Sequence, residues 1–134
     1  ELMIADNIAY ADRVIEATVP AGVPLVMAGF SQGVAMAFRA AVRGARHANG
    51  VVAVGGDVPP ELLADAGAVF PPVLLLRGRQ DDWYTASKLE ADLAALETRG
   101  VPARATTCEG GHEWNDAVSL AAAAFITGLG TGAR

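Results

Sequence analysis

A chain of 134 residues, of which 52% are hydrophobic and 19% charged, has the composition of one folded globular domain rather than of a disordered segment. The net charge is −5 and the charged residues are dispersed, which argues against nucleic acid as a partner because nucleic-acid-binding proteins carry a basic patch. The longest apolar run, residues 120–126, is far shorter than the ~20 residues of a membrane span, so no membrane span is expected.

Cysteine content and the first residues bear on the cellular compartment. Cys108 is the only cysteine, which rules out an internal disulfide and a cysteine zinc cluster. Residues 1–10 carry no basic region followed by an apolar run, as a signal peptide would. We therefore expect a cytoplasmic location.

Amphipathic helices and short apolar strands alternate along the chain. In chain order the patterns predict a helix over 3–19, a strand over 25–28, a helix over 32–46, a strand over 51–54, a short helix over 60–66, a strand over 73–76, a helix over 87–99, a strand over 103–108 and a helix over 113–129. Strands that alternate with helices in this way indicate βαβ units. The expected fold class is α/β, with roughly four parallel strands flanked by helices in three layers and residues 1–134 forming a single domain.

The strongest motif is G-F-S-Q-G at residues 29–33, between a predicted strand and a predicted helix. Pattern and position are those of a nucleophile elbow, although the five residues alone also occur in ordinary glycine-rich loops. The turn is so tight that Ser31 must adopt a strained backbone, and flanking side chains would collide, so glycine is required at Gly29 and Gly33. The same turn aims the backbone N–H of Gln32 at a developing oxyanion.

A serine nucleophile needs a base and an acid that orients the base. Asp81 follows the strand over 73–76 at its carboxyl end, with Asp82 as the adjacent competitor. Of the two histidines, His47 precedes a strand and so lies at the amino edge of the sheet, whereas His112 follows the strand over 103–108. Ser31, Asp81 and His112 thus stand in the chain order of α/β-hydrolases.

These features resemble the phospholipase/carboxylesterase family of α/β-hydrolases, which includes the acyl-protein thioesterases. The resemblance rests on G-F-S-Q-G at 29–33, G-R-Q-D at 78–81 and G-H-E at 111–113. It implies that Ser31 is the nucleophile, Asp81 the acid and His112 the base, and the spacing from Gly78 to Asp81 selects Asp81 over Asp82. The segment D-W-Y at 82–84 departs from the family's usual turn, which ends in Val-Pro.

The resemblance also implies that the front of the fold is absent. Family members usually carry about four further strands before the first helix of this chain, and the loop that supplies a second oxyanion N–H lies there. The chain is therefore expected to be the C-terminal half of a hydrolase. Either the chain is a fragment that an N-terminal segment completes, or another subunit completes it. A homo-oligomer is one form of the second case. In both cases the strand over 25–28 has an unprotected edge.

The reaction expected from these residues is hydrolysis of a small-molecule ester or thioester through an acyl-enzyme, with no metal or organic cofactor. Trp83 and Trp114 closely follow the proposed acid and base, and either wall the acyl or alcohol pocket or pack at the bases of loops. Two alternatives remain open. One is a half-domain with little or no activity that serves as a binding or assembly module. The other is a triad enzyme that transfers the acyl group to peroxide or an alcohol.

Overall fold

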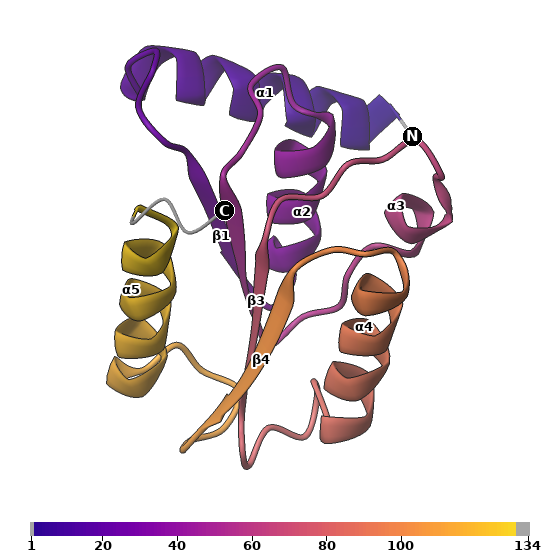
Figure 1. Cartoon of the computed structure of the whole chain (residues 1–134), viewed down its shortest axis with the longest axis vertical. Coiled ribbons are helices and arrows are strands. Elements are labelled where there is room, and N and C mark those ends of the chain that lie inside the picture. The colour runs from indigo at the N-terminus through magenta and orange to yellow at the C-terminus, as the bar shows by residue number, and fades with distance from the viewer. Residues whose placement is uncertain (1, 131–134) are drawn as a thin grey trace.

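The computed structural model describes residues 2–130 as a three-layer α/β fold, with a sheet between two layers of helices (Figure 1). The strands are all parallel and lie in the order β1-β2-β3-β4, so each pairs with the next strand in the chain. The expected fold class is confirmed. The elements are α1 (Leu2–Thr18), β1 (Val26–Phe30), α2 (Gly33–Arg43), β2 (Gly50–Val54), α3 (Pro60–Ala64), β3 (Val73–Gly78), α4 (Ala86–Thr98), β4 (Ala103–Cys108) and α5 (Asp116–Gly130).

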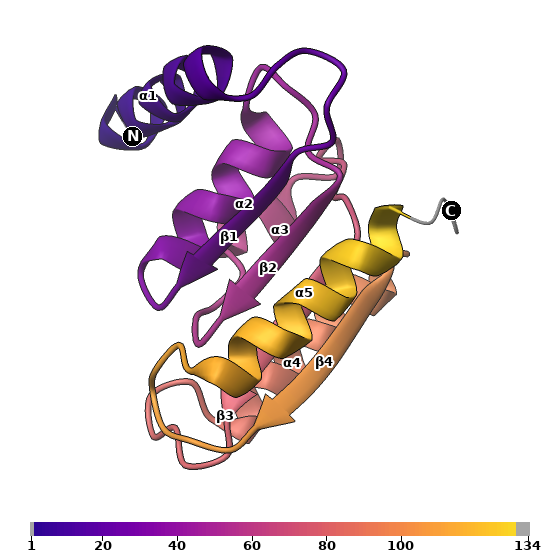
Figure 2. The same cartoon turned by 90° about the vertical axis from the view of Figure 1, so that its left-hand side faces the viewer.

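The helices divide between the two faces of the sheet. On one face α2 packs against β1 and β2, α4 packs against β3 and β4, and α1 packs on the outside of α2. On the other face lies α5, which covers β2, β3 and β4 and stands in front of the sheet in Figure 2. Because β2 and β3 are covered on both faces, every residue in them is buried, which explains their continuous apolar sequences. The carboxyl ends of the four strands meet at one edge of the sheet.

Most element boundaries differ from the sequence prediction by one to three residues, and three of these differences bear on the site or have a visible cause. Helix α2 ends at Arg43 rather than at residue 46, because the chain becomes extended at Gly44. Strand β3 continues two residues beyond the predicted end, so that Arg77 belongs to it. Helix α5 begins at Asp116 rather than at residue 113, since the Asn115 side chain accepts a hydrogen bond from the Val118 N–H (3.1 Å) and caps the helix there.

Strand β1 forms one edge of the sheet in the described part of the chain and pairs with β2 alone. Its residues are half-buried or exposed, in contrast to those of β2. The unprotected edge that the sequence predicts is therefore present over Val26–Phe30, one residue further along the chain than expected. Across residues 2–130, no helix combines the length and the apolar character that crossing a membrane requires.

Candidate active site

The turn between β1 and α2 carries Ser31 in a strained conformation. Its φ is +57°, and no other non-glycine residue between 2 and 130 has a positive φ. Such a conformation costs of order 1–3 kcal/mol and persists where the surroundings hold it. Here the Ser31 N–H donates to the Val54 carbonyl oxygen (2.8 Å) and the Ser31 carbonyl accepts from the Val34 N–H (3.1 Å). The turn is thus anchored to the neighbouring strand and to the first turn of α2.

The steric need for glycine holds at one of the two predicted positions. A Cβ at Gly29 would overlap the Gly33 carbonyl oxygen, so glycine is required there, as predicted. A Cβ at Gly33 would meet no atom within 4 Å, so the prediction that Gly33 must be glycine is wrong. The two positions differ because a Cβ on Gly29 would point at the backbone of Gly33, whereas a Cβ on Gly33 would point into open space.

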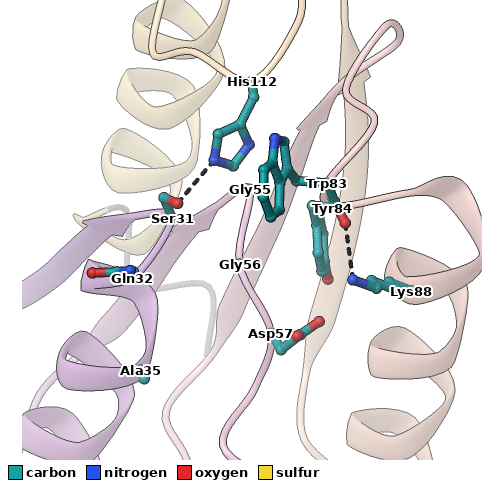
Figure 3. Close-up of a pocket in the computed structure, with 10 residues that line it drawn as sticks. All are labelled: Ser31, Gln32, Ala35, Gly55, Gly56, Asp57, Trp83, Tyr84, Lys88 and His112. Carbon is teal, nitrogen blue, oxygen red and sulfur yellow. Dashed lines mark hydrogen bonds between the residues drawn. The ribbon is translucent and has the colours of Figure 1, made fainter.

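Ser31, His112 and Asp81 form a continuous chain of hydrogen bonds. Ser31 Oγ lies 2.8 Å from His112 Nε2, and His112 Nδ1 lies 2.8 Å from Asp81 Oδ2 (Figure 3 shows the first bond). With the ring proton on Nδ1, the Ser31 hydroxyl donates to Nε2 and the imidazole donates to the carboxylate. The three side chains come from the carboxyl ends of β1, β3 and β4, which the parallel sheet brings to one edge.

Asp81 is held as an ionised carboxylate. It is 4% exposed, and its Oδ1 accepts hydrogen bonds from the backbone N–H groups of Trp83 (2.8 Å) and Tyr84 (2.9 Å). Burial by itself would raise the pKa of Asp81, but the hydrogen bonds from His112 and these two N–H groups outweigh burial, so the pKa lies below its ordinary value. Asp82 is exposed, and it is Asp81 that reaches His112.

Aromatic rings stand close to the His112 imidazole. The Phe30 ring centroid lies 4.9 Å from that of His112, and the Trp83 ring centroid lies 6.4 Å away. The loop that carries His112 is tied to the loop that carries Asp81, because the Gln80 N–H donates to the Gly110 carbonyl oxygen (2.9 Å) and the Gln80 side chain accepts from the Gly110 N–H (2.8 Å). These contacts restrict the imidazole to a small range of positions.

A cavity of about 590 Å³ opens beside Ser31 and His112. Trp83 lines it, as predicted, with its side chain 74% exposed. Trp114 is not among the lining residues: its indole N–H donates to Ser119 Oγ (2.8 Å) on α5, which favours the alternative that it packs at the base of a loop. Figure 3 shows Ser31 on one side of the cavity and Trp83 on the other. The remaining lining residues are Gln32, Ala35, Gly55, Gly56, Asp57, Tyr84 and Lys88.

Gln32 follows Ser31 at the N-terminal end of α2 and is one of the residues that line this cavity. Within residues 2–130 its backbone N–H has no hydrogen-bond partner, so it is available to an anionic oxygen. His47 is exposed and lines a different cavity, with residues at the amino ends of β3 and β4, as expected from its place before a strand.

Sequence reasoning missed the glycine pair that follows β2. Gly55 has a φ of +67°, and a Cβ there would lie 3.2 Å from His112 Cε1 and 3.3 Å from Nδ1. A Cβ at Gly56 would overlap the Ser31 carbonyl oxygen. The G-G sequence at the carboxyl end of a buried strand was the available signal, since glycine there often marks a close approach.

Between residues 2 and 130 no group of three or more His, Cys, Asp and Glu side chains is arranged to hold a metal ion.

The parallel sheet, the strained serine turn and the order of the hydrogen-bonded residues together define an α/β-hydrolase fold. Solved structures agree: esterase PE8 superimposes with a TM-score of 0.77 and 27% identity, covering 91% of this chain and 58% of that one. Arabidopsis thaliana SOBER1 (TM-score 0.75) and Zea mays acyl-protein thioesterase 2 (TM-score 0.73) are each 19% identical, covering 94% of this chain and 64% of theirs. No family model and no curated protein matches the sequence. The chain spans 58–64% of the length of these structures, and its placement as the C-terminal half of a hydrolase stays a prediction.

Proposed function

We propose that this protein is a serine hydrolase that cleaves carboxylic ester or thioester bonds through an acyl-enzyme intermediate. The observation that carries the proposal is the chain of two 2.8 Å hydrogen bonds from Ser31 through His112 to Asp81. The fold similarity to an esterase and to an acyl-protein thioesterase supports the same reaction class. Ser31 is the proposed nucleophile, His112 the general base and Asp81 the acid that orients the imidazole.

The proposed reaction proceeds in two steps. Ser31 Oγ attacks the carbonyl carbon while His112 Nε2 takes the hydroxyl proton, and the carbonyl π electrons move onto the oxygen. Collapse of the tetrahedral intermediate breaks the bond to the alcohol or thiol, which leaves with the proton from His112. A water molecule, activated by the same imidazole, then attacks the acyl-enzyme and releases the carboxylic acid. Asp81 stays ionised throughout, which its lowered pKa favours.

The oxyanion of each intermediate is proposed to bind the N–H of Gln32, which has no other partner in the described residues. A second donor is expected from a segment or subunit that pairs with the open edge of β1, because Ser31 directly follows that strand. Loss of one oxyanion donor costs about 10²–10³-fold in rate. We therefore expect slow but measurable acylation of Ser31 by the 134-residue chain, and faster acylation when the edge of β1 is completed.

The experiment is labelling of the chain by a fluorophosphonate, read by intact mass and by peptide mapping. Wild type is expected to gain one adduct, on Ser31, and Ser31→Ala none. Ser87→Ala is the matched control, since Ser87 is exposed on α4 and does not line the cavity. An adduct on Ser31→Ala equal to that on wild type would overturn the assignment. A folded wild-type chain that stays unlabelled would favour the binding or assembly module.

Product analysis addresses the remaining alternative, acyl transfer to another acceptor. With p-nitrophenyl acetate as the substrate, added peroxide or alcohol is expected to leave acetate as the main product. A peracid or a new ester in its place would identify a perhydrolase or an acyltransferase that uses the same three residues.

A further inference from the structure

Arg77 is a buried cation that binds backbone carbonyls of the loop carrying Asp81. It lies in β3 and is 8% exposed. Its Nε donates to the Tyr84 carbonyl oxygen (2.9 Å), and its Nη2 donates to those of Asp81 (3.1 Å) and Arg79 (3.3 Å). No carboxylate in the described part of the chain forms an ion pair with it. Burying a guanidinium is costly unless its donors are used, and here they are used on this loop, residues 79–84.

Tyr84 is held at the other end of the same loop. Its hydroxyl donates to Asp92 Oδ2 (2.7 Å) in α4, and the same oxygen accepts from the Val58 N–H (3.4 Å). Tyr84 is 2% exposed and Asp92 is 9% exposed, so water competes little for this bond. The backbone N–H of Tyr84 is one of the two that bind Asp81 Oδ1. Tyr84 thus has its carbonyl, its hydroxyl and its N–H all fixed by protein groups.

These contacts determine which way the Asp81 carboxylate faces. With Oδ1 bound to two backbone N–H groups, Oδ2 is left to His112 Nδ1. The N–H groups of Trp83 and Tyr84 keep their direction only while the loop backbone keeps its path, and Arg77 binds the carbonyls of Asp81 and Tyr84, which belong to the peptides on either side of the two that carry these N–H groups. The orientation of the Asp81 carboxylate therefore depends on the Arg77 side chain, which does not contact that carboxylate.

We propose that Arg77 and the Tyr84–Asp92 pair are positioning residues, which orient Asp81 toward His112 by fixing the backbone of residues 79–84. None of the three forms a hydrogen bond to Ser31 or to His112, although Tyr84 lines the cavity. The proposal rests on the proposed function, because it concerns the efficiency of the same three residues. A displacement of about 1 Å in such a group lowers the rate by about 10²-fold, and replacing the acid by its amide sets an upper bound of about 10⁴-fold.

The kinetic test uses Arg77→Lys, which keeps the charge but loses the planar fork of donors. We expect kcat for p-nitrophenyl acetate to fall about 10²-fold with little change in KM. The matched control is Arg99→Lys, because Arg99 also donates to two backbone carbonyls, that of Leu63 in α3 (3.0 Å) and that of Ala68 in the loop after it (2.7 Å), and neither residue lines the cavity. Arg99→Lys is expected to lower the melting temperature but to leave kcat unchanged.

A spectroscopic test does not depend on turnover. The Nδ1–H proton of a histidine bonded to a carboxylate gives a far-downfield NMR signal, here assigned by its loss in Asp81→Asn. We expect the signal to weaken or move upfield in Arg77→Lys and in Tyr84→Phe, and to persist in Arg99→Lys. Tyr84→Phe keeps the aromatic ring and loses only the bond to Asp92, so it decides the question if Arg77→Lys does not fold.

Two failures can be told apart. If wild type is labelled at Ser31 while a folded Arg77→Lys or Tyr84→Phe protein keeps both its kcat and its NMR signal, the positioning role is wrong and the hydrolase proposal stands. If wild type is not labelled, the proposed function fails, and the NMR signal still shows whether these residues orient Asp81.

Discussion

The close approach of Gly55 to His112 makes a quantitative prediction for Gly55→Ala. The φ of +67° at this position is strained for any residue with a Cβ, at a cost of about 1–2 kcal/mol. For a domain of this size, 1 kcal/mol corresponds to roughly 3–5 °C in melting temperature. We therefore expect Gly55→Ala to melt about 3–10 °C below wild type.

The same substitution also perturbs the imidazole. The new Cβ would lie 3.2 Å from His112 Cε1 and 3.3 Å from Nδ1, closer than the optimum of about 3.5–4.0 Å for carbon contacts. The ring must move by a few tenths of an ångström, although it bridges two 2.8 Å hydrogen bonds. If a displacement of about 1 Å lowers the rate about 10²-fold, a displacement of a few tenths of an ångström should lower kcat about three- to tenfold.

Gly100→Ala separates the two effects. Gly100 has a φ of +77° at the end of α4, and a Cβ there would meet no atom within 4 Å. We expect Gly100→Ala to lose melting temperature as Gly55→Ala does, with kcat for p-nitrophenyl acetate unchanged. Thermal unfolding and steady-state kinetics of the two variants give both quantities. Equal kcat values for Gly55→Ala and wild type would refute this reasoning, because they would mean that the close approach of Gly55 to His112 does not affect turnover.

Other substitutions test single features of the site and the turn. Asp81→Asn is expected to lower kcat by up to about 10⁴-fold and the exposed Asp82→Asn to leave it unchanged, and similar losses from both would refute the choice of acid. Because the pKa of Asp81 is lowered in the folded state, its contribution to stability is present above the ordinary pKa of 3.8 and is lost as the pH falls through the folded pKa. In urea unfolding at acid pH, the free energy of unfolding should therefore depend less on pH for Asp81→Asn than for wild type. Burial raises the pKa of Asp92 and outweighs the hydrogen bond from Tyr84, so the contribution of Asp92 to stability is lost as the pH rises through the folded pKa. Asp92→Asn should therefore gain stability relative to wild type as the pH rises. Parallel curves of unfolding free energy against pH for the two proteins would contradict this. Gly29→Ala should destabilise the protein strongly, whereas Gly33→Ala should add about 0.5–1 kcal/mol to the free energy of unfolding; equal melting temperatures would be the contrary result.

The sequence by itself determined the alternation of strands and helices and the order of the chemical groups along the chain. Buried parallel strands are continuously apolar and their helices are amphipathic, so both are readable from local pattern. Because parallel strands place their carboxyl ends at one edge, the residues that follow β1, β3 and β4 could be predicted to meet. The structure brings the side chains of Ser31, Asp81 and His112 into one chain of hydrogen bonds at that edge.

Only the tertiary structure decided what depends on the paths of the loops that follow the strands. The family spacing already favoured Asp81 over Asp82, but the two backbone N–H groups that hold the Asp81 carboxylate in place are seen only in the structure. Arg77 ends an apolar strand in the sequence, and its role emerges only when the loop folds back over it. Trp114 follows His112 by two residues, yet the start of α5 turns its indole toward Ser119. In each case the direction of a side chain is set by the path of the loop that follows a strand, and the hydrophobic period of the sequence does not encode the path of an irregular backbone.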